Sequence, residues 1–83
     1  MQTLAVRDRL KRLMADLFRC EEAEIADSTG PGDLPGWDSL GHVSLMTELQ
    51  REFGVHVPIE DALDVESFEG LVLVVERLLG ERV

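Results

Sequence analysis

The chain has 83 residues, 45% of them hydrophobic, so it can form one domain with one modest core, and we treat residues 1–83 as that domain. This length excludes a multidomain enzyme. A single cysteine, Cys20, excludes an intramolecular disulfide and a zinc cluster of paired thiols. The net charge of −9 divides into +3 over residues 1–19 and −12 over residues 20–83, an imbalance that disfavours nucleic-acid binding and favours basic protein partners.

The composition also argues against a membrane role. The most apolar run, Leu71 to Val75, is far too short to cross a bilayer. Arg7 and Arg9 stand where a signal peptide needs an apolar stretch. We therefore expect a soluble, cytoplasmic protein that binds no membrane, in which Cys20 is a small, partly buried side chain near a helix end.

A first helix is predicted over residues 3–19. Thr3 is its candidate N-cap, because a threonine side chain can accept a hydrogen bond from the first turn. Apolar residues recur at intervals of three and four along this segment, as on one face of a helix. They are Leu4, Val6, Leu10, Leu13, Met14, Leu17 and Phe18.

The segment from Cys20 to Trp37 has no helical period and contains two prolines and three glycines. Irregular loops of this length in compact domains usually carry a function. We expect Ile25, Leu34 and Trp37 to hold the loop on the core.

Three further helices follow. The second is predicted over residues 39–53, with Gly54 as its C′ residue, and a short third helix over 59–63 begins after Pro58. Ser67 caps the last helix, which Gly80 is expected to end. The apolar residues that define the second and fourth helices are Leu45, Met46, Leu49, Phe53, Phe68, Leu71, Val72, Val75, Leu78 and Leu79.

Val55, Val57 and Ile59 alternate with other residues as in a strand, but the sequence shows no partner strand. The prediction is therefore an all-α fold. Its three long helices and one short helix form a small four-helix bundle with a long loop between helices one and two.

Ser39 stands at the start of the second helix. Asp38 is a good N-cap, and its capping of the first turn would leave the Ser39 hydroxyl exposed. A helix N-terminus favours an anion, so a phosphate on Ser39 would be well placed. The alternative is an ordinary helix start without chemistry, and the long preceding loop favours a function.

His42 lies one turn after Ser39, so the two could touch. A hydrolytic triad is disfavoured, because the sequence shows neither an oxyanion hole nor a buried acid to orient the imidazole. We expect His42 to be a surface residue or a partner contact. A calcium-binding helical pair is excluded as well, since the acidic residues lack the ligand spacing of such a loop.

The order of these features resembles the signature of acyl carrier proteins across essentially the whole chain. The elements come in the order and spacing of that family: first helix, long loop, Asp-Ser-Leu, second helix ending in Phe-Gly, short helix, apolar helix. The matching residues of the central motif are Asp38, Ser39, Leu40, Val43, Leu45, Met46, Glu48, Leu49, Glu52, Phe53 and Gly54.

The resemblance implies a carrier rather than an enzyme, with no catalytic residue and no metal site. A phosphopantetheinyl transferase would join 4′-phosphopantetheine from coenzyme A to Ser39. The thiol of that arm would hold an acyl or aminoacyl group as a thioester. An acyl- or aminoacyl-loading enzyme and a downstream synthase or transferase would be the other partners of a monomeric carrier.

In the family the second helix is the recognition helix. The residues expected to bind partners are Asp38, Leu40, Val43, Thr47 and Glu48. Core packing is the alternative for Leu40 and Val43. Where fatty-acid carriers usually show acids, this chain has Gly41, Ser44, Gln50 and Arg51. These departures disfavour docking to fatty-acid enzymes. Trp37 before Asp38 and the Gly41-His42 pair after Leu40 look more like a stand-alone carrier of a specialised pathway, such as polyketide or nonribosomal peptide biosynthesis.

Two alternatives stay open. An acyl chain could enter between helices two and three beside Ile59, Ala62 and Leu63, although core packing explains these residues equally well. The whole chain could instead be an unmodified helical interaction module. Such a module would tolerate Ser39→Ala, which a carrier would not.

Overall fold

The computed structural model describes the backbone of residues 2–81 and the side chains of residues 6–81. Within that range the chain is all-α, with α1 (Gln2–Phe18), a 3-10 turn η1 (Glu22–Glu24), α2 (Ser39–Phe53), α3 (Ile59–Asp64) and α4 (Phe68–Glu81). The described residues contain no strand, so the predicted four-helix fold is confirmed and the strand at 55–59 is rightly rejected. No described helix is long and apolar enough to span a membrane.

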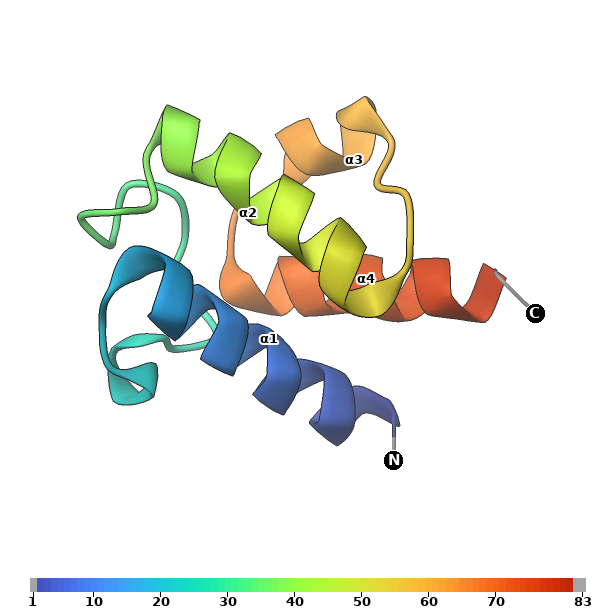
Figure 1. Cartoon of the computed structure of the whole chain (residues 1–83), viewed down its shortest axis with the longest axis horizontal. Coiled ribbons are helices and arrows are strands. Elements are labelled where there is room, and N and C mark those ends of the chain that lie inside the picture. The colour runs from blue at the N-terminus through green and yellow to red at the C-terminus, as the bar shows by residue number, and fades with distance from the viewer. Residues whose placement is uncertain (1, 82–83) are drawn as a thin grey trace.

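Helix α1 packs against both α2 and α4. In Figure 1, α2 and α3 lie on one side of α4, and the loop between α1 and α2 occupies the end of the bundle where α2 begins. The predicted loop anchors are confirmed, because Trp37 and Ile25 are buried at 0% and 1% exposure and Leu34 is also buried. The core takes in these anchors and side chains of all three long helices: Val6, Leu10, Met14, Leu45, Met46, Leu49, Phe53, Phe68, Leu71, Val72, Val75 and Leu78. Leu4 lies outside the described side chains.

Both ends of α1 differ from the prediction. The helix already includes Gln2, so Thr3 is not its N-cap. At the other end Arg19 adopts a left-handed conformation with φ 57°, and the Cys20 N–H donates to the Ala15 carbonyl oxygen at 3.0 Å. This bond closes the helix as a Schellman motif, which usually has glycine at the left-handed position.

The long loop also caps α4. The Phe68 N–H donates to the Thr29 carbonyl oxygen at 2.6 Å, and the Glu69 N–H donates to the Asp27 carbonyl oxygen at 3.0 Å. The Ser67 hydroxyl accepts from the Gly70 N–H at 3.1 Å, which confirms its predicted capping role. The loop that leads to α2 therefore satisfies the N–H groups of Phe68 and Glu69, and Ser67 satisfies that of Gly70.

Helix α4 runs through Gly80, so the predicted stop at this glycine is wrong. Gly80 does not adopt the left-handed conformation of a helix terminator, whereas Gly54 does, with φ 67° at the end of α2. An ion pair between Arg77 and Glu81 at 3.1 Å spans Gly80 and supports the last turn.

Candidate functional site

The start of α2 presents Ser39 to solvent. Asp38 has an extended backbone, and its carboxylate accepts the Gly41 N–H at 2.8 Å, which confirms it as the N-cap. Ser39 is the first residue of the helix and its side chain is exposed, as predicted. An anionic group on this hydroxyl would lie beside the positive end of the α2 macrodipole.

Gly41 lets the loop approach α2 closely. A Cβ atom built on Gly41 would lie 1.9 Å from the carbonyl oxygen of Gly36, far inside van der Waals contact. Only glycine therefore fits between this helix and the loop without a backbone shift. The close approach fixes the loop directly against the first turn that carries Ser39.

His42 is half-buried and its ring nitrogens contact groups other than Ser39, so the expectation of a surface residue is wrong, whereas its role as a partner contact stays a prediction. Its Nδ1 accepts the indole N–H of Trp37 at 2.9 Å, and its Nε2 lies 2.8 Å from the Ala62 carbonyl oxygen. Both ring nitrogens are thus occupied by groups other than Ser39. Sequence spacing gave no sign of these contacts, because Ala62 lies twenty residues away and uses its backbone.

A cleft of about 660 Å³ opens beside Ser39, between α2 and α3. Ser39, His42 and Val43 line it from α2, and Ala62 and Leu63 line it from α3. The phosphopantetheine arm fits this setting, because the hydroxyl that would bear it is exposed and opens onto a partly apolar cleft.

Four large apolar side chains are exposed on α2 and α3, and the core-packing alternative is wrong for all of them. Leu40 and Val43 are 77% and 63% exposed, and Ile59 and Leu63 are each 75% exposed. Helix α3 buries none of its residues, and Ala62 is partly buried against the core. We call the four side chains the α2–α3 apolar face.

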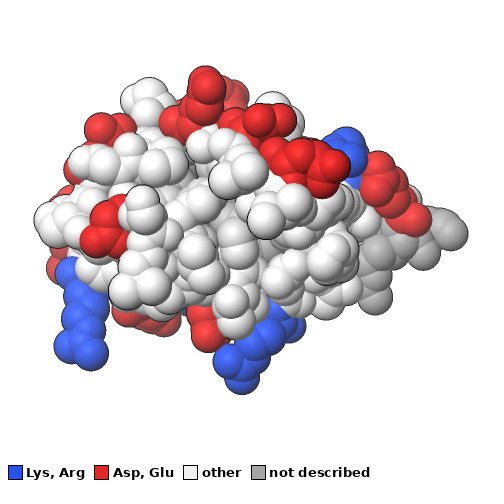
Figure 2. Space-filling model, turned by 90° about the horizontal axis from the view of Figure 1, so that it is seen from above, with Lys and Arg blue, Asp and Glu red and all other residues white. Residues whose placement is uncertain are grey.

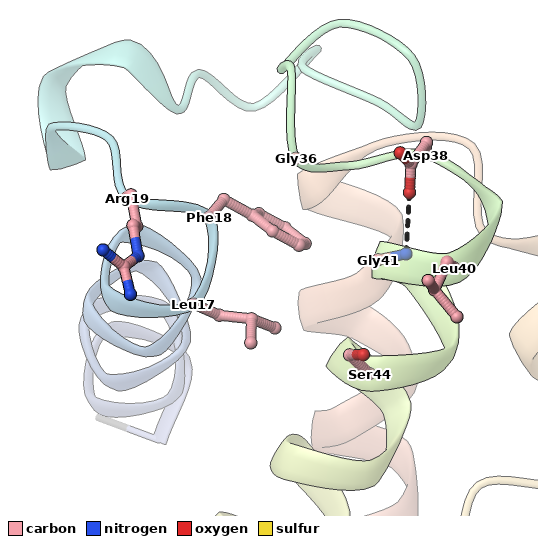
Figure 3. Close-up of a pocket in the computed structure, with 8 residues that line it drawn as sticks. All are labelled: Leu17, Phe18, Arg19, Gly36, Asp38, Leu40, Gly41 and Ser44. Carbon is pink, nitrogen blue, oxygen red and sulfur yellow. Dashed lines mark hydrogen bonds between the residues drawn. The ribbon is translucent and has the colours of Figure 1, made fainter.

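A second hollow, of about 350 Å³, lies on the other side of the start of α2. Figure 3 shows Leu17 and Phe18 extending from the end of α1 toward α2, with Leu40, Gly41 and Ser44 on the opposite wall. The hydrogen bond between Asp38 and Gly41 lies at its rim. Ser39 does not line this hollow, so the cleft toward α3 is the one that adjoins the attachment candidate.

The remaining expected contact residues lie on the exposed side of α2. Thr47 is exposed, and its hydroxyl donates to the Val43 carbonyl oxygen at 3.2 Å. The carboxylate of Glu48 is paired with Arg51 at 3.3 Å, and that of Glu52 with Arg9 at 3.0 Å. Both carboxylates on α2 therefore have a cation beside them.

Cys20 follows the end of α1 and is partly buried, as expected. Burial, reinforced by the negative charges of Glu24 and Glu21, raises the pKa of its thiol above the ordinary value. A raised pKa leaves less thiolate at neutral pH, and the thiolate is the reactive form. Burial and the two glutamates thus favour the protonated thiol of Cys20.

The helical bundle, the capped exposed serine and the adjoining cleft suit a protein that carries a covalently attached group. Comparison with known proteins agrees with this class. A family model for the phosphopantetheine attachment site matches residues 8–75. An acyl carrier protein from Solidesulfovibrio magneticus is 27% identical over 78 residues, which are 94% of this chain and 100% of that protein.

A second relative is much larger. The non-reducing polyketide synthase pigA from Monascus ruber is 28% identical over 75 residues, which are 90% of this chain but 3% of the synthase. The chain belongs to the acyl carrier protein family, whose members bear phosphopantetheine. It is therefore a carrier protein with covalent 4′-phosphopantetheine as its prosthetic group, and not an enzyme.

Proposed function

We propose that Ser39 is the residue to which 4′-phosphopantetheine is attached. The observation that carries this proposal is that the capping residue and the exposed hydroxyl at the start of α2 belong to different side chains. Asp38 takes the Gly41 N–H, and the neighbouring Ser39 hydroxyl stays exposed beside the cleft. By contrast, the Ser67 hydroxyl is occupied as a helix cap.

The arm supplies a terminal thiol that holds an acyl or aminoacyl group as a thioester, a link that stays reactive toward nucleophiles. The chain's own residues hold and present it. Asp38 fixes the helix start, Gly41 allows the loop to close on it, and Trp37 anchors that loop in the core. The raised pKa of the Cys20 thiol supports a carrier in which the prosthetic thiol, and not Cys20, holds the acyl group.

The partners we propose are a phosphopantetheinyl transferase, an acyl- or aminoacyl-loading enzyme, and a downstream synthase or transferase. Leu40 and Val43 of the α2–α3 apolar face would meet them, with Asp38, Thr47 and Glu48 around these two. Figure 2 shows that the side of the molecule formed by α2 and α3 is largely uncharged through its middle. Apolar contact is therefore the main attraction this side offers to an enzyme.

We place this carrier in a specialised pathway, such as polyketide or nonribosomal peptide biosynthesis. The likeness to a segment of a polyketide synthase supports this placement. The ion pairs of Glu48 and Glu52 support this placement too. Both carboxylates of α2 have an arginine beside them, so α2 is less suited to an enzyme that recognises unpaired acids. A net charge of −9 disfavours self-association, so we propose a monomer.

The test is the intact mass of the purified protein after incubation with coenzyme A and a broad-specificity phosphopantetheinyl transferase. We expect wild type and Ser44→Ala to gain one phosphopantetheine, and Ser39→Ala to gain none. Ser44 is a matched control because it lies on the same helix but lines the other hollow. Modification of Ser39→Ala, with its folding unchanged, would refute the assignment.

A further inference from the structure

His42 bridges two separate parts of the chain across the α2–α3 cleft. Its Nδ1 is 2.9 Å from the indole nitrogen of Trp37, and its Nε2 is 2.8 Å from the carbonyl oxygen of Ala62. An indole N–H can only donate a hydrogen bond and a carbonyl oxygen can only accept one. In this arrangement Nδ1 accepts the Trp37 N–H and Nε2–H donates to the Ala62 carbonyl oxygen.

The Trp37 end of the bridge is fixed. Trp37 is fully buried, and its ring lies 6.0 Å from that of Phe18 between centroids. Its backbone N–H donates to the Leu34 carbonyl oxygen at 3.0 Å, and its carbonyl oxygen accepts the Gly32 N–H at 2.6 Å. His42 is thus attached on one side to a well-packed part of the loop.

The other end of the bridge is a weakly held helix. Helix α3 has six residues and buries none of them, so little apolar packing holds it in place. Two polar contacts attach it to its neighbours: Arg77 of α4 donates to the Asp61 carboxylate at 2.6 Å, and His42 of α2 donates to the Ala62 carbonyl oxygen. The histidine is therefore the polar link between α3 and the helix that begins with Ser39.

We propose that His42 is a positioning residue that latches α3 against α2. The latch sets the width of the cleft beside Ser39 and the spacing between Val43 and Leu63, which line that cleft from opposite sides. A partner enzyme that touches both helices then meets one preset surface. This consequence for the carrier rests on the function proposed for Ser39, whereas the latch itself does not.

The experiment measures amide hydrogen exchange by NMR on the unmodified protein, expressed as protection factors that correct for the intrinsic effect of pH. It compares wild type with His42→Ala, His42→Gln and His56→Ala at neutral pH. A glutamine amide offers an acceptor oxygen and a donor NH2 group in place of the two imidazole nitrogens. His56 is exposed and serves as the matched control.

In His42→Ala, we expect the α3 amides of Ala62 and Leu63 to lose protection about tenfold, while α1 and α4 change by less than about threefold. His42→Gln should keep most of the α3 protection of wild type, and His56→Ala should match wild type. The latch is refuted by α3 protection that is equal in wild type and His42→Ala, by equal losses in every helix, or by loss of α3 protection in His56→Ala as large as in His42→Ala. None of these outcomes bears on whether Ser39 is modified.

Discussion

At the residue scale, Gly41 and Gly80 show how surroundings decide the effect of one substitution. A Cβ on Gly41 would meet the Gly36 carbonyl oxygen, whereas a Cβ on Gly80 meets nothing within 4 Å. We expect Gly41→Ala to lower the free energy of unfolding by about 1–3 kcal/mol through steric strain. Gly80→Ala should raise it by up to about 1 kcal/mol through helix propensity. Urea denaturation measures both, and effects of the same sign would contradict this account.

The raised pKa of Cys20 predicts slow alkylation in the folded, unmodified protein. Iodoacetamide should react more slowly than with free cysteine near neutral pH, and its rate should keep rising to higher pH because the thiolate forms later. Unfolding in urea should bring the rate to that of an ordinary thiol. Equal rates in the folded and unfolded protein would show that burial does not protect Cys20. Mass spectrometry follows the reaction directly.

Residue roles that depend on local sequence could be predicted, and roles that depend on distant backbone could not. The capping by Asp38 and the exposure of Ser39 were predicted correctly because a cap and the residue after it are adjacent in sequence. The two partners of His42 were missed, since the Trp37 ring must first be placed by the core and Ala62 contributes only its carbonyl oxygen. A histidine one turn into a helix gives no signal of either contact.

At the scale of elements, the end of α1 carries local strain. Arg19 holds the left-handed conformation that a Schellman motif reserves for glycine, and no hydrogen bond or ion pair of its side chain is recorded in the described residues. We expect Arg19→Gly to raise the free energy of unfolding by about 0.5–1 kcal/mol. Relief of the left-handed strain stabilises the fold, and the entropy that glycine adds to the unfolded chain offsets part of this gain. Thermal or urea unfolding measures this, and a loss of stability would show that the arginine side chain contributes more than its backbone costs.

The elements were predictable where a helix has its own end signals. The bounds of α2 matched at both ends because Asp38 caps it and Gly54 turns out of it in the left-handed conformation. The helix end predicted at Gly80 is wrong, since a glycine ends a helix only where the chain turns out of it. The exposure of Ile59 and Leu63 could not be foreseen either, because a six-residue helix has too few positions to show which face is buried.

At the scale of the whole molecule, the charge of −9 and the α2–α3 apolar face predict how partners dock. Leu40→Asp should lower kcat/KM for phosphopantetheinyl transfer at least about tenfold, because it places a charge in an apolar contact. Leu73→Asp, which alters an exposed leucine on α4, should stay within about twofold of wild type. Both side chains are exposed, so stability should change little in either variant. Equal kinetics in the two variants would contradict docking through this face.

The central claim is that the arm is attached to Ser39, and the most direct measurement is to locate it by fragmentation mass spectrometry. Cleavage after Arg19 and Arg51 gives one peptide, residues 20–51, that contains Ser28, Ser39 and Ser44. We predict that every fragment bearing phosphopantetheine includes residue 39. An arm found on Ser28 or Ser44 would contradict the claim.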